Sequence, residues 1–156
     1  MLLNIENEVT PADSRSHLRY HFKLDRPCPG LRVRFEYSPK ILEERKLAIE
    51  LIQRSIERYV EPERQKPMLE RAEQYAPLRN LITVSIDDSR GHRGACHRHD
   101  PVQELYLSER EASPGLKRGT IPAGTWTVTL SLHSIVTERC AYRLKVWAAE
   151  AEEGCR

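Results

Sequence analysis

The sequence has no long hydrophobic run and no strong excess of charge of either sign. None of its windows approaches the roughly 18 consecutive apolar residues that a membrane-spanning helix requires, so we expect no membrane partner. Its 25 Lys and Arg residues nearly balance its 23 Asp and Glu residues, which leaves a formal net charge of +2. A dedicated nucleic-acid-binding protein carries a stronger positive field, so we expect no nucleic-acid partner.

Cysteine is scarce and follows no recognisable spacing. The four cysteines, Cys28, Cys96, Cys140 and Cys155, form no C-x-x-C pair and no dense framework. We interpret them as reduced thiols of a cytoplasmic protein, and a Cys96–Cys140 disulfide in another compartment is the alternative. The first ten residues contain two acids and no apolar core run, which argues against a signal peptide.

The signatures of several large enzyme classes are absent as well. The sequence contains no G-x-S-x-G, H-E-x-x-H, G-x-x-x-x-G-K-[ST] or G-x-G-x-x-G motif. These absences favour a protein that is not an enzyme, but they do not exclude an enzyme.

Alternation of apolar and polar residues is the dominant pattern. Trp126, Val128, Leu130 and Leu132 alternate with Thr and Ser, which is the period of a strand with one buried face. Similar alternation predicts six strands in all, at residues 18–24, 31–37, 81–86, 102–107, 125–132 and 142–147. Six short strands without a β-α-β rhythm predict a mainly β fold, an antiparallel β-sandwich of jelly-roll type.

A helical segment interrupts the strands at residues 39–77. Its apolar residues recur at helical spacing and form a stripe on a helix from Ile41 to Val60, made of Ile41, Ala48, Ile52, Ile56, Tyr59 and Val60. A shorter helix is predicted from about Pro67 to Ala76. We expect the stripe to cover a face or edge of a sheet, and these helices are the candidate surface for a protein partner or a homo-oligomer.

The predicted organisation is a single β-sandwich domain over residues 1–156. Residues 1–16 are polar and aperiodic, so we expect a loose arm there. The helical insertion at 39–77 lies between the second and third predicted strands, and residues 148–156 form an acidic tail without a pattern.

A group of metal-ligating residue types follows the third predicted strand. His92, Cys96, His97, His99 and Asp100 lie within nine residues, and His133 comes from another predicted strand. This composition suits zinc or another divalent metal, although the spacing matches none of the recognised closed zinc sites. The favoured interpretation is a polar loop without a cofactor, whose histidines hydrogen-bond to backbone carbonyls.

Basic residues surround the same segment and form a second candidate site. Together they could contact a phosphate or an anionic partner, and the alternative is a solvated rim; the residues are Arg90, Arg93, Arg98, Lys117 and Arg118. Asp87 and Asp88 are predicted to form a turn in preference to a cation site.

The two tryptophans differ in phase. Trp126 belongs to an apolar face and is predicted to lie in the core. Trp147 is out of phase with its strand, so an exposed platform that stacks on a sugar is an open interpretation.

Two segments resemble a known family. They are Leu78–Ala95, with its Arg93-Gly94 step, and Ser113–Leu130, with Ser113-Pro114-Gly115 and Ile121-Pro122-Ala123-Gly124-Thr125-Trp126. They resemble the β-sandwich region that precedes the catalytic domain in bacterial PHP-type metallohydrolases of the CehA/McbA group. His92, where that family tends to have an aromatic residue, and the helical insertion are departures from the pattern.

The resemblance implies a β-sandwich and no activity of its own. The catalytic half of that family opens with a D-x-H-x-H type metal motif, which these 156 residues do not contain, so no catalytic residue is carried over. The sequence therefore predicts a non-catalytic accessory or interaction module of unknown ligand, of the kind associated with PHP-type metallohydrolases. The alternative is a small metal- or phosphate-dependent hydrolase that uses the His92–Asp100 loop.

Overall fold

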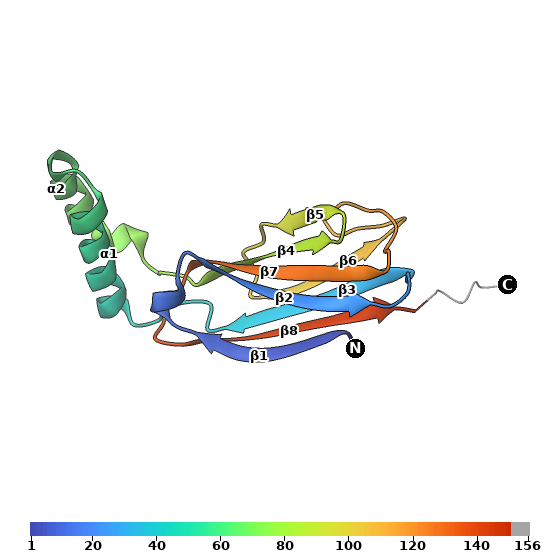
Figure 1. The fold of residues 1–156 in the computed structure, drawn as a ribbon. Coiled ribbons are helices and arrows are strands. Elements are labelled where there is room, and N and C mark those ends of the chain that lie inside the picture. Colours follow the sequence, from blue (N-terminus) through green and yellow to red (C-terminus); the bar gives the residue numbers. More distant parts are fainter. Residues whose placement is uncertain (151–156) are drawn as a thin grey trace.

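The computed structural model describes residues 1–150, which form two four-stranded antiparallel sheets packed face to face (Figure 1). The strands are β1 (Leu3–Val9), β2 (Ser16–Leu24), β3 (Gly30–Ser38), β4 (Leu81–Asp88), β5 (Gly91–Cys96), β6 (Val102–Ser108), β7 (Gly124–Ser134) and β8 (Cys140–Ala149). A short 3-10 helix, η1 (Pro11–Asp13), connects β1 to β2.

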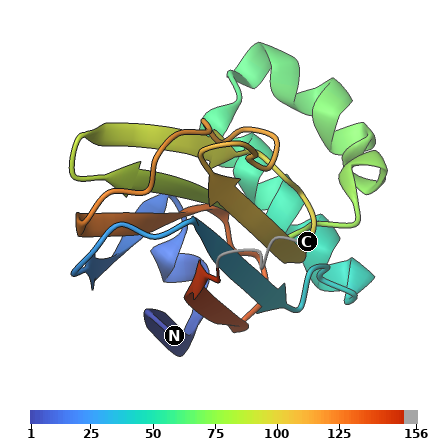
Figure 2. The ribbon, with the colours of Figure 1, turned by 90° about the vertical axis from the view of Figure 1, so that its right-hand side faces the viewer.

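The strand order within the sheets is β1-β8-β3-β6 and β2-β7-β4-β5. Successive strands alternate between the two sheets from β1 to β4 and again from β5 to β8, which is the order of a jelly roll. Figure 2 looks at the sandwich from the side opposite the helices and separates the two layers. The predicted antiparallel β-sandwich is confirmed.

The core lies between the two sheets, where the inward side chains of every strand meet. Trp126 and Leu144 are fully buried, and the ring of Phe22 stacks near the Trp126 ring at a centroid distance of 6.4 Å. Leu18 of β2 is half-buried and packs against this core. Alternation therefore identified the inward positions correctly, because a one-residue shift would turn every apolar side chain outward.

The structure corrects the expected loose arm and moves the start of the expected tail. Residues 3–9 are not a loose arm but strand β1, which pairs along its whole length with β8. Its alternation is weak because the polar residue Asn7 stands at the inward phase between Ile5 and Val9, so the strand depends on pairing with the distant β8. Strand β8 also continues through Ala149, into the expected tail, whose residues 151–156 lie outside the described part of the chain.

The insertion between β3 and β4 consists of α1 (Arg45–Tyr59), α2 (Pro62–Glu70) and η2, a 3-10 helix (Ala72–Tyr75). The sequence predicted the insertion between its second and third strands. Once β1 is counted, these strands are β3 and β4, so the position is the same. The first helix begins at Arg45 and not near Ile41, and α2 begins at Pro62, where proline suits a first helical position. No helix within residues 1–150 is long and apolar enough to cross a membrane.

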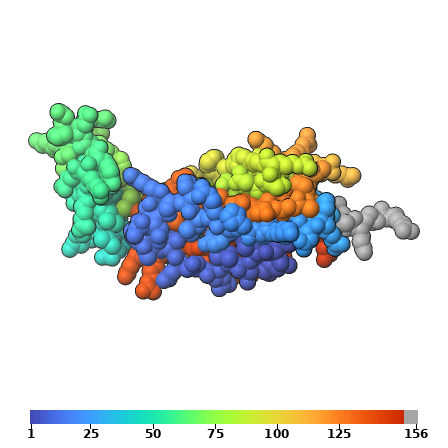
Figure 3. All heavy atoms as spheres, viewed as in Figure 1, coloured from blue at the N-terminus to red at the C-terminus, as the bar shows by residue number. Residues whose placement is uncertain are grey.

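The helices do not cover a sheet, contrary to the expectation. They extend away from one end of the sandwich (Figures 1 and 3), and the stripe on α1 packs against α2 and η2. Ile52 and Ile56 form a small second core with Ala72, flanked by Met68 and Leu69. Tyr59, predicted for the stripe, is 58% exposed. A partner or homo-oligomer that docks on these helices remains a prediction.

Asn80 fastens the base of the insertion to the sandwich. Its side chain is fully buried, and its amide group donates hydrogen bonds of 2.8 Å to the Pro39 carbonyl and to Oγ1 of Thr137. Its side-chain oxygen accepts a hydrogen bond of 2.8 Å from the backbone N–H of Val136. One residue thus joins the start of the insertion, its end and the β7–β8 connection.

Replacing the central core residue should unfold the protein. Trp126→Ala removes the largest fully buried side chain, so we expect a loss of about 3–5 kcal/mol in the free energy of unfolding. Chemical denaturation monitored by circular dichroism measures it. Tyr75→Ala, at an exposed aromatic residue of η2, is the control and should change the stability little.

Removing the insertion should leave the sandwich folded, because the helices pack mainly on one another. Residues 43–77 can be replaced by a short Gly-Ser linker, since the backbone N–H of Leu42 already bonds to the Leu78 carbonyl at 2.9 Å. We expect a cooperative melt and an unchanged near-ultraviolet circular dichroism spectrum from the buried tryptophan. Deletion of residues 1–9 is the contrasting variant and should destroy the melt; a folded deletion would contradict the role given to β1.

Candidate functional site

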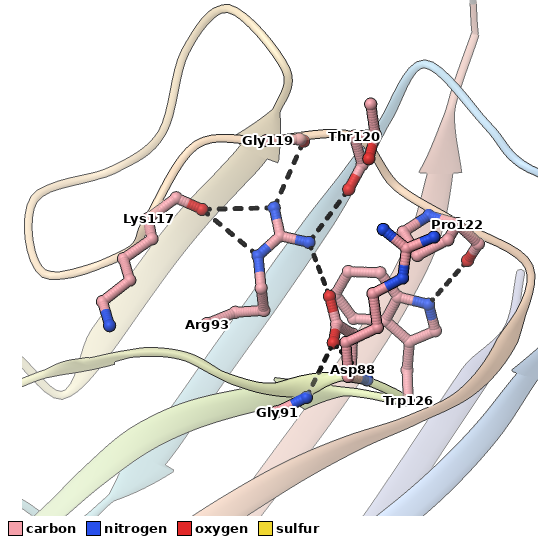
Figure 4. A network of polar contacts seen from close by, with 9 residues as sticks. Asp88, Gly91, Arg93, Lys117, Gly119, Thr120, Pro122 and Trp126 are labelled. Atoms are coloured by element: carbon pink, nitrogen blue, oxygen red, sulfur yellow. Dashed lines mark hydrogen bonds and ion pairs between the residues drawn. The ribbon is translucent and has the colours of Figure 1, made fainter.

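Arg93 was predicted to bind an anion, but its guanidinium is bound inside the protein (Figure 4). Nε and Nη2 both donate to the Lys117 carbonyl, at 3.4 and 3.2 Å, and Nη2 also donates to the Gly119 carbonyl at 3.2 Å. Nη1 donates to the Thr120 carbonyl at 3.0 Å and to Oδ2 of Asp88 at 2.9 Å. These five hydrogen bonds use every N–H of the guanidinium. Arg93 therefore has no donor left for a ligand.

Asp88 completes the ion pair from the end of β4. Burial alone would raise the pKa of its carboxyl group. The hydrogen bonds from Arg93 and from the backbone N–H groups of Arg90 and Gly91 lower it by more, so the pKa lies below its ordinary value. The two backbone bonds, of 2.7 and 3.0 Å to Oδ1, make the turn that the sequence predicted.

The same network holds Trp126 in place. The Arg93 guanidinium carbon lies 5.3 Å from the centre of the Trp126 ring, a cation–π contact inside the protein. The indole N–H donates to the Pro122 carbonyl at 3.1 Å. The turn before β7 is thus coupled to the indole that β7 places in the core.

Two glycines allow the β6–β7 connection to lie against β5. Gly94 and Gly115 both have positive φ angles, of +128° and +95°, and a Cβ on Gly94 would meet the Gly115 carbonyl oxygen at 2.1 Å. The backbone N–H of Ala95 donates to that same carbonyl at 3.1 Å. Only glycine permits this approach. The segments that carry the family resemblance therefore meet here, as a structural contact and not as a binding site.

The remaining basic residues of the predicted cluster do not gather. Arg90 precedes β5 and Arg98 follows it, so the six-residue strand holds them roughly 20 Å apart. Lys117 and Arg118 are exposed on the β6–β7 connection, where they line a hollow of about 530 Å³ with Arg110.

The predicted metal-ligating residues are also dispersed, because residues 91–96 are strand β5 and not part of a long loop. His92 Nδ1 contacts Oδ1 of Asp87 at 3.0 Å at one end of β5, whereas His97, His99 and Asp100 follow the other end. His133 Nε2 contacts the Thr83 hydroxyl at 2.8 Å. Across residues 1–150, no three His, Cys, Asp or Glu side chains are grouped so that they could hold a metal ion.

Cys96 points into the core and away from those histidines. Burial raises the pKa of its thiol, which donates to the Pro114 carbonyl at 3.6 Å. Cys28 and Cys140 are free thiols too, so the alternative Cys96–Cys140 disulfide is not formed. Cys155 lies outside the described residues.

A hollow of about 830 Å³ lies on the outer face of the β1-β8-β3-β6 sheet. Three side chains from neighbouring strands form a row on its floor, since Arg32 of β3 pairs with Trp147 of β8 on one side and with Tyr106 of β6 on the other. The Arg32 guanidinium carbon lies 6.0 Å from the centre of the Tyr106 ring. We call these three residues the aromatic row.

Charged groups of both signs surround the aromatic row. Arg34 forms an ion pair of 3.0 Å with Glu36 and another with Glu104, and Glu111 and Glu150 also line the hollow. Guanidinium donors and carboxylate acceptors thus lie beside two ring faces. The sequence signal for this site was Trp147, which breaks the phase of β8, whereas Arg32 and Tyr106 resemble any other outward residue.

Breaking the Arg93–Asp88 pair should cost much of the fold's stability. Asp88→Asn keeps the side-chain shape but leaves the Arg93 charge buried without a counterion, so we expect a loss of about 3–5 kcal/mol in denaturant unfolding. Asp87→Asn is the matched control, since its ion pair with His92 is exposed, and it should change the stability by about 1 kcal/mol at most.

The same pair predicts a pH dependence. Because the pKa of Asp88 is lowered on folding from an ordinary value of 3.8, its contribution is present above that pH and is lost as the pH falls below it. The stability difference between the unmodified protein and Asp88→Asn should therefore shrink below about pH 4. If the unmodified protein and Asp88→Asn differed in stability by the same amount above and below this pH, the carboxylate charge would not be involved.

The comparisons with known proteins assign no family. No protein-family model matches the chain, and no curated protein matches it. Among solved structures, the crystal structure of GEBA250068378 from Sulfurospirillum deleyianum is similar over 96% of this chain and 99% of that one, with 10% sequence identity and a TM-score of 0.36. A similarity of this degree carries no argument about ligand or activity.

Proposed function

We propose that this protein is a non-catalytic binding module that recognises a carbohydrate on the outer face of the β1-β8-β3-β6 sheet. The observation that carries the proposal is the aromatic row. Trp147, Arg32 and Tyr106 lie side by side on three neighbouring strands and line a hollow of about 830 Å³.

The chemistry of this hollow fits a sugar better than a fully apolar or a fully ionic ligand. A pyranose has an apolar C–H face that packs on an aromatic ring, and hydroxyl groups at its rim that both donate and accept hydrogen bonds. Here Trp147 and Tyr106 supply ring surface, Arg32 supplies donors, and Glu104 supplies an acceptor. A mixed set of this kind suits a ligand with many hydroxyls.

The position on a sheet favours binding with little reorganisation. All three residues of the aromatic row stand on strands fixed by continuous pairing with their neighbours. A preorganised surface loses less entropy on binding than a loop that must first become ordered. No element within residues 1–150 has to move to admit a ligand to this open face.

The association with a PHP-type metallohydrolase rests on the sequence resemblance alone and remains a prediction. In that arrangement the module would bring an enzyme to a polymer, without a catalytic residue of its own. Within residues 1–150, the residues of the alternative hydrolase do not gather, because they stand at both ends of β5 and on β7.

Tryptophan fluorescence tests the proposal, since Trp126 is fully buried and Trp147 is the second of only two tryptophans. We expect saturable fluorescence changes with at least one of the soluble xylo-, cello-, chito- and galacturonate oligosaccharides. Trp147→Ala should lower the affinity for that sugar tenfold or more, about 1.4 kcal/mol measured by calorimetry. Arg32→Gln should also weaken it.

The control for these variants is Tyr75→Ala, which removes an exposed aromatic side chain from the insertion and should bind normally. Absence of saturable binding across the panel, or unchanged affinity in Trp147→Ala, would contradict the proposal.

A further inference from the structure

The outer face of the second sheet, β2-β7-β4-β5, carries a basic surface that has no role so far. Its edge strand β2 projects four basic side chains outward at alternating positions: His17, Arg19, His21 and Lys23. We call these four residues the basic ladder. Successive members are roughly 7 Å apart, because a strand rises about 3.4 Å per residue.

Hydroxyl groups of β7 stand opposite every member of the basic ladder. Lys23, His21, Arg19 and His17 pair in register with Thr125, Thr127, Thr129 and Ser131. Two of these pairs are side-chain contacts, from His17 Nδ1 to the Ser131 hydroxyl at 3.0 Å and from His21 Nδ1 to the Thr127 hydroxyl at 2.8 Å.

These contacts orient both imidazoles. With Nδ1 occupied by a hydroxyl, the second ring nitrogen, Nε2, is the one left for a ligand. When the hydroxyl donates to Nδ1, the neutral ring carries its proton on Nε2, and the protonated ring donates from both nitrogens. With the hydroxyls as donors to Nδ1, the histidines offer Nε2–H donors on either side of Arg19.

A hollow of about 490 Å³ lies over this part of the sheet. Its lining consists of Arg19, the two imidazoles, three hydroxyls of β7, Ser85 and Asp87. Asp87, the only acid among them, already contacts His92. Arg19 makes no ion pair with any residue between 1 and 150. The hollow is therefore rich in donors and poor in carboxylates.

We propose that this hollow is a second ligand site, which binds the oxyanion of a phosphate or sulfate ester. Arg19 supplies a planar fork of N–H donors that matches two oxygens of a tetrahedral anion. The imidazole Nε2–H groups and the hydroxyls of Thr129 and Ser85 supply donors to the remaining oxygens. The site faces away from the aromatic row, and its ligand is independent of the carbohydrate proposed there.

Calorimetric titration with inorganic sulfate and inorganic phosphate, at ionic strength matched with sodium chloride, tests the site. We expect saturable binding of at least one anion, with a preference for sulfate indicating a sulfate ester and a preference for phosphate a phosphate ester. Arg19→Gln should weaken binding tenfold or more, and Arg19→Lys should weaken it less, because the charge remains while the fork is lost.

Arg54→Gln, on the exposed side of α1, is the matched control and should bind both anions normally. Melting curves of each variant verify its fold, which substitutions at exposed edge-strand positions should leave intact. Trp147→Ala should bind the anion normally as well, so failure of the carbohydrate site and failure of this site are distinguishable. Binding of neither anion beyond that of chloride, or equal binding by Arg19→Gln, would overturn the proposal.

Discussion

The buried guanidinium of Arg93 is the constraint on which one end of this sandwich depends. A charge removed from water is tolerated only when it is paired and fully hydrogen-bonded. Arg93 meets that condition through Asp88 and three carbonyls of the β6–β7 connection. That connection, residues 109–123, contains no helix or strand. The network therefore gives a long connection a defined path, and joins it to Trp126 and the core.

The surfaces that we propose as ligand sites lie on the two outer faces of the sandwich. One end is occupied by the Arg93 network and the other by Asn80 and the base of the insertion. On each sheet, the period of the strand sends every second side chain outward at a fixed spacing. One outer face has the aromatic row with mixed charges, and the other has the basic ladder beside a row of hydroxyls. The same rigid scaffold can thus present two different chemistries.

The helical insertion is organised by its own small core. Its apolar residues on α1 meet α2 and η2 within about 20 residues of chain, so burial does not require the sandwich. Local contacts of this kind form with little loss of loop entropy. The helices are therefore attached at Asn80 and otherwise stand beside the sheets.

The family resemblance also has a physical explanation. Its residues include Arg93-Gly94, Gly115 and the turn before Trp126, and the structure brings them together around one buried charge and one close backbone approach. Such residues specify a path of the chain. They say nothing about a ligand.

The sequence by itself determined which positions are inward on six of the eight strands, because strict alternation has a local cause in the geometry of a strand. It also placed Trp126 in the core and the insertion between the correct strands. It missed β1, whose inward residues are few, and β5, whose two glycines and two polar residues resemble a loop. Both are edge strands that form through pairing with β8 and β4.

Only the tertiary structure decided the roles of the charged residues. Arg93 and Arg90 are three positions apart with the same chemistry, yet one is buried among five acceptor contacts and the other is exposed. His92 and His97 are close in the sequence, but the extended strand β5 separates them, with His92 near its start and His97 just after its end. The aromatic row and the basic ladder became surfaces only when the strands paired. Alternation is a local property that a sequence displays, whereas burial of a charge and convergence across strands depend on residues brought together from distant parts of the chain.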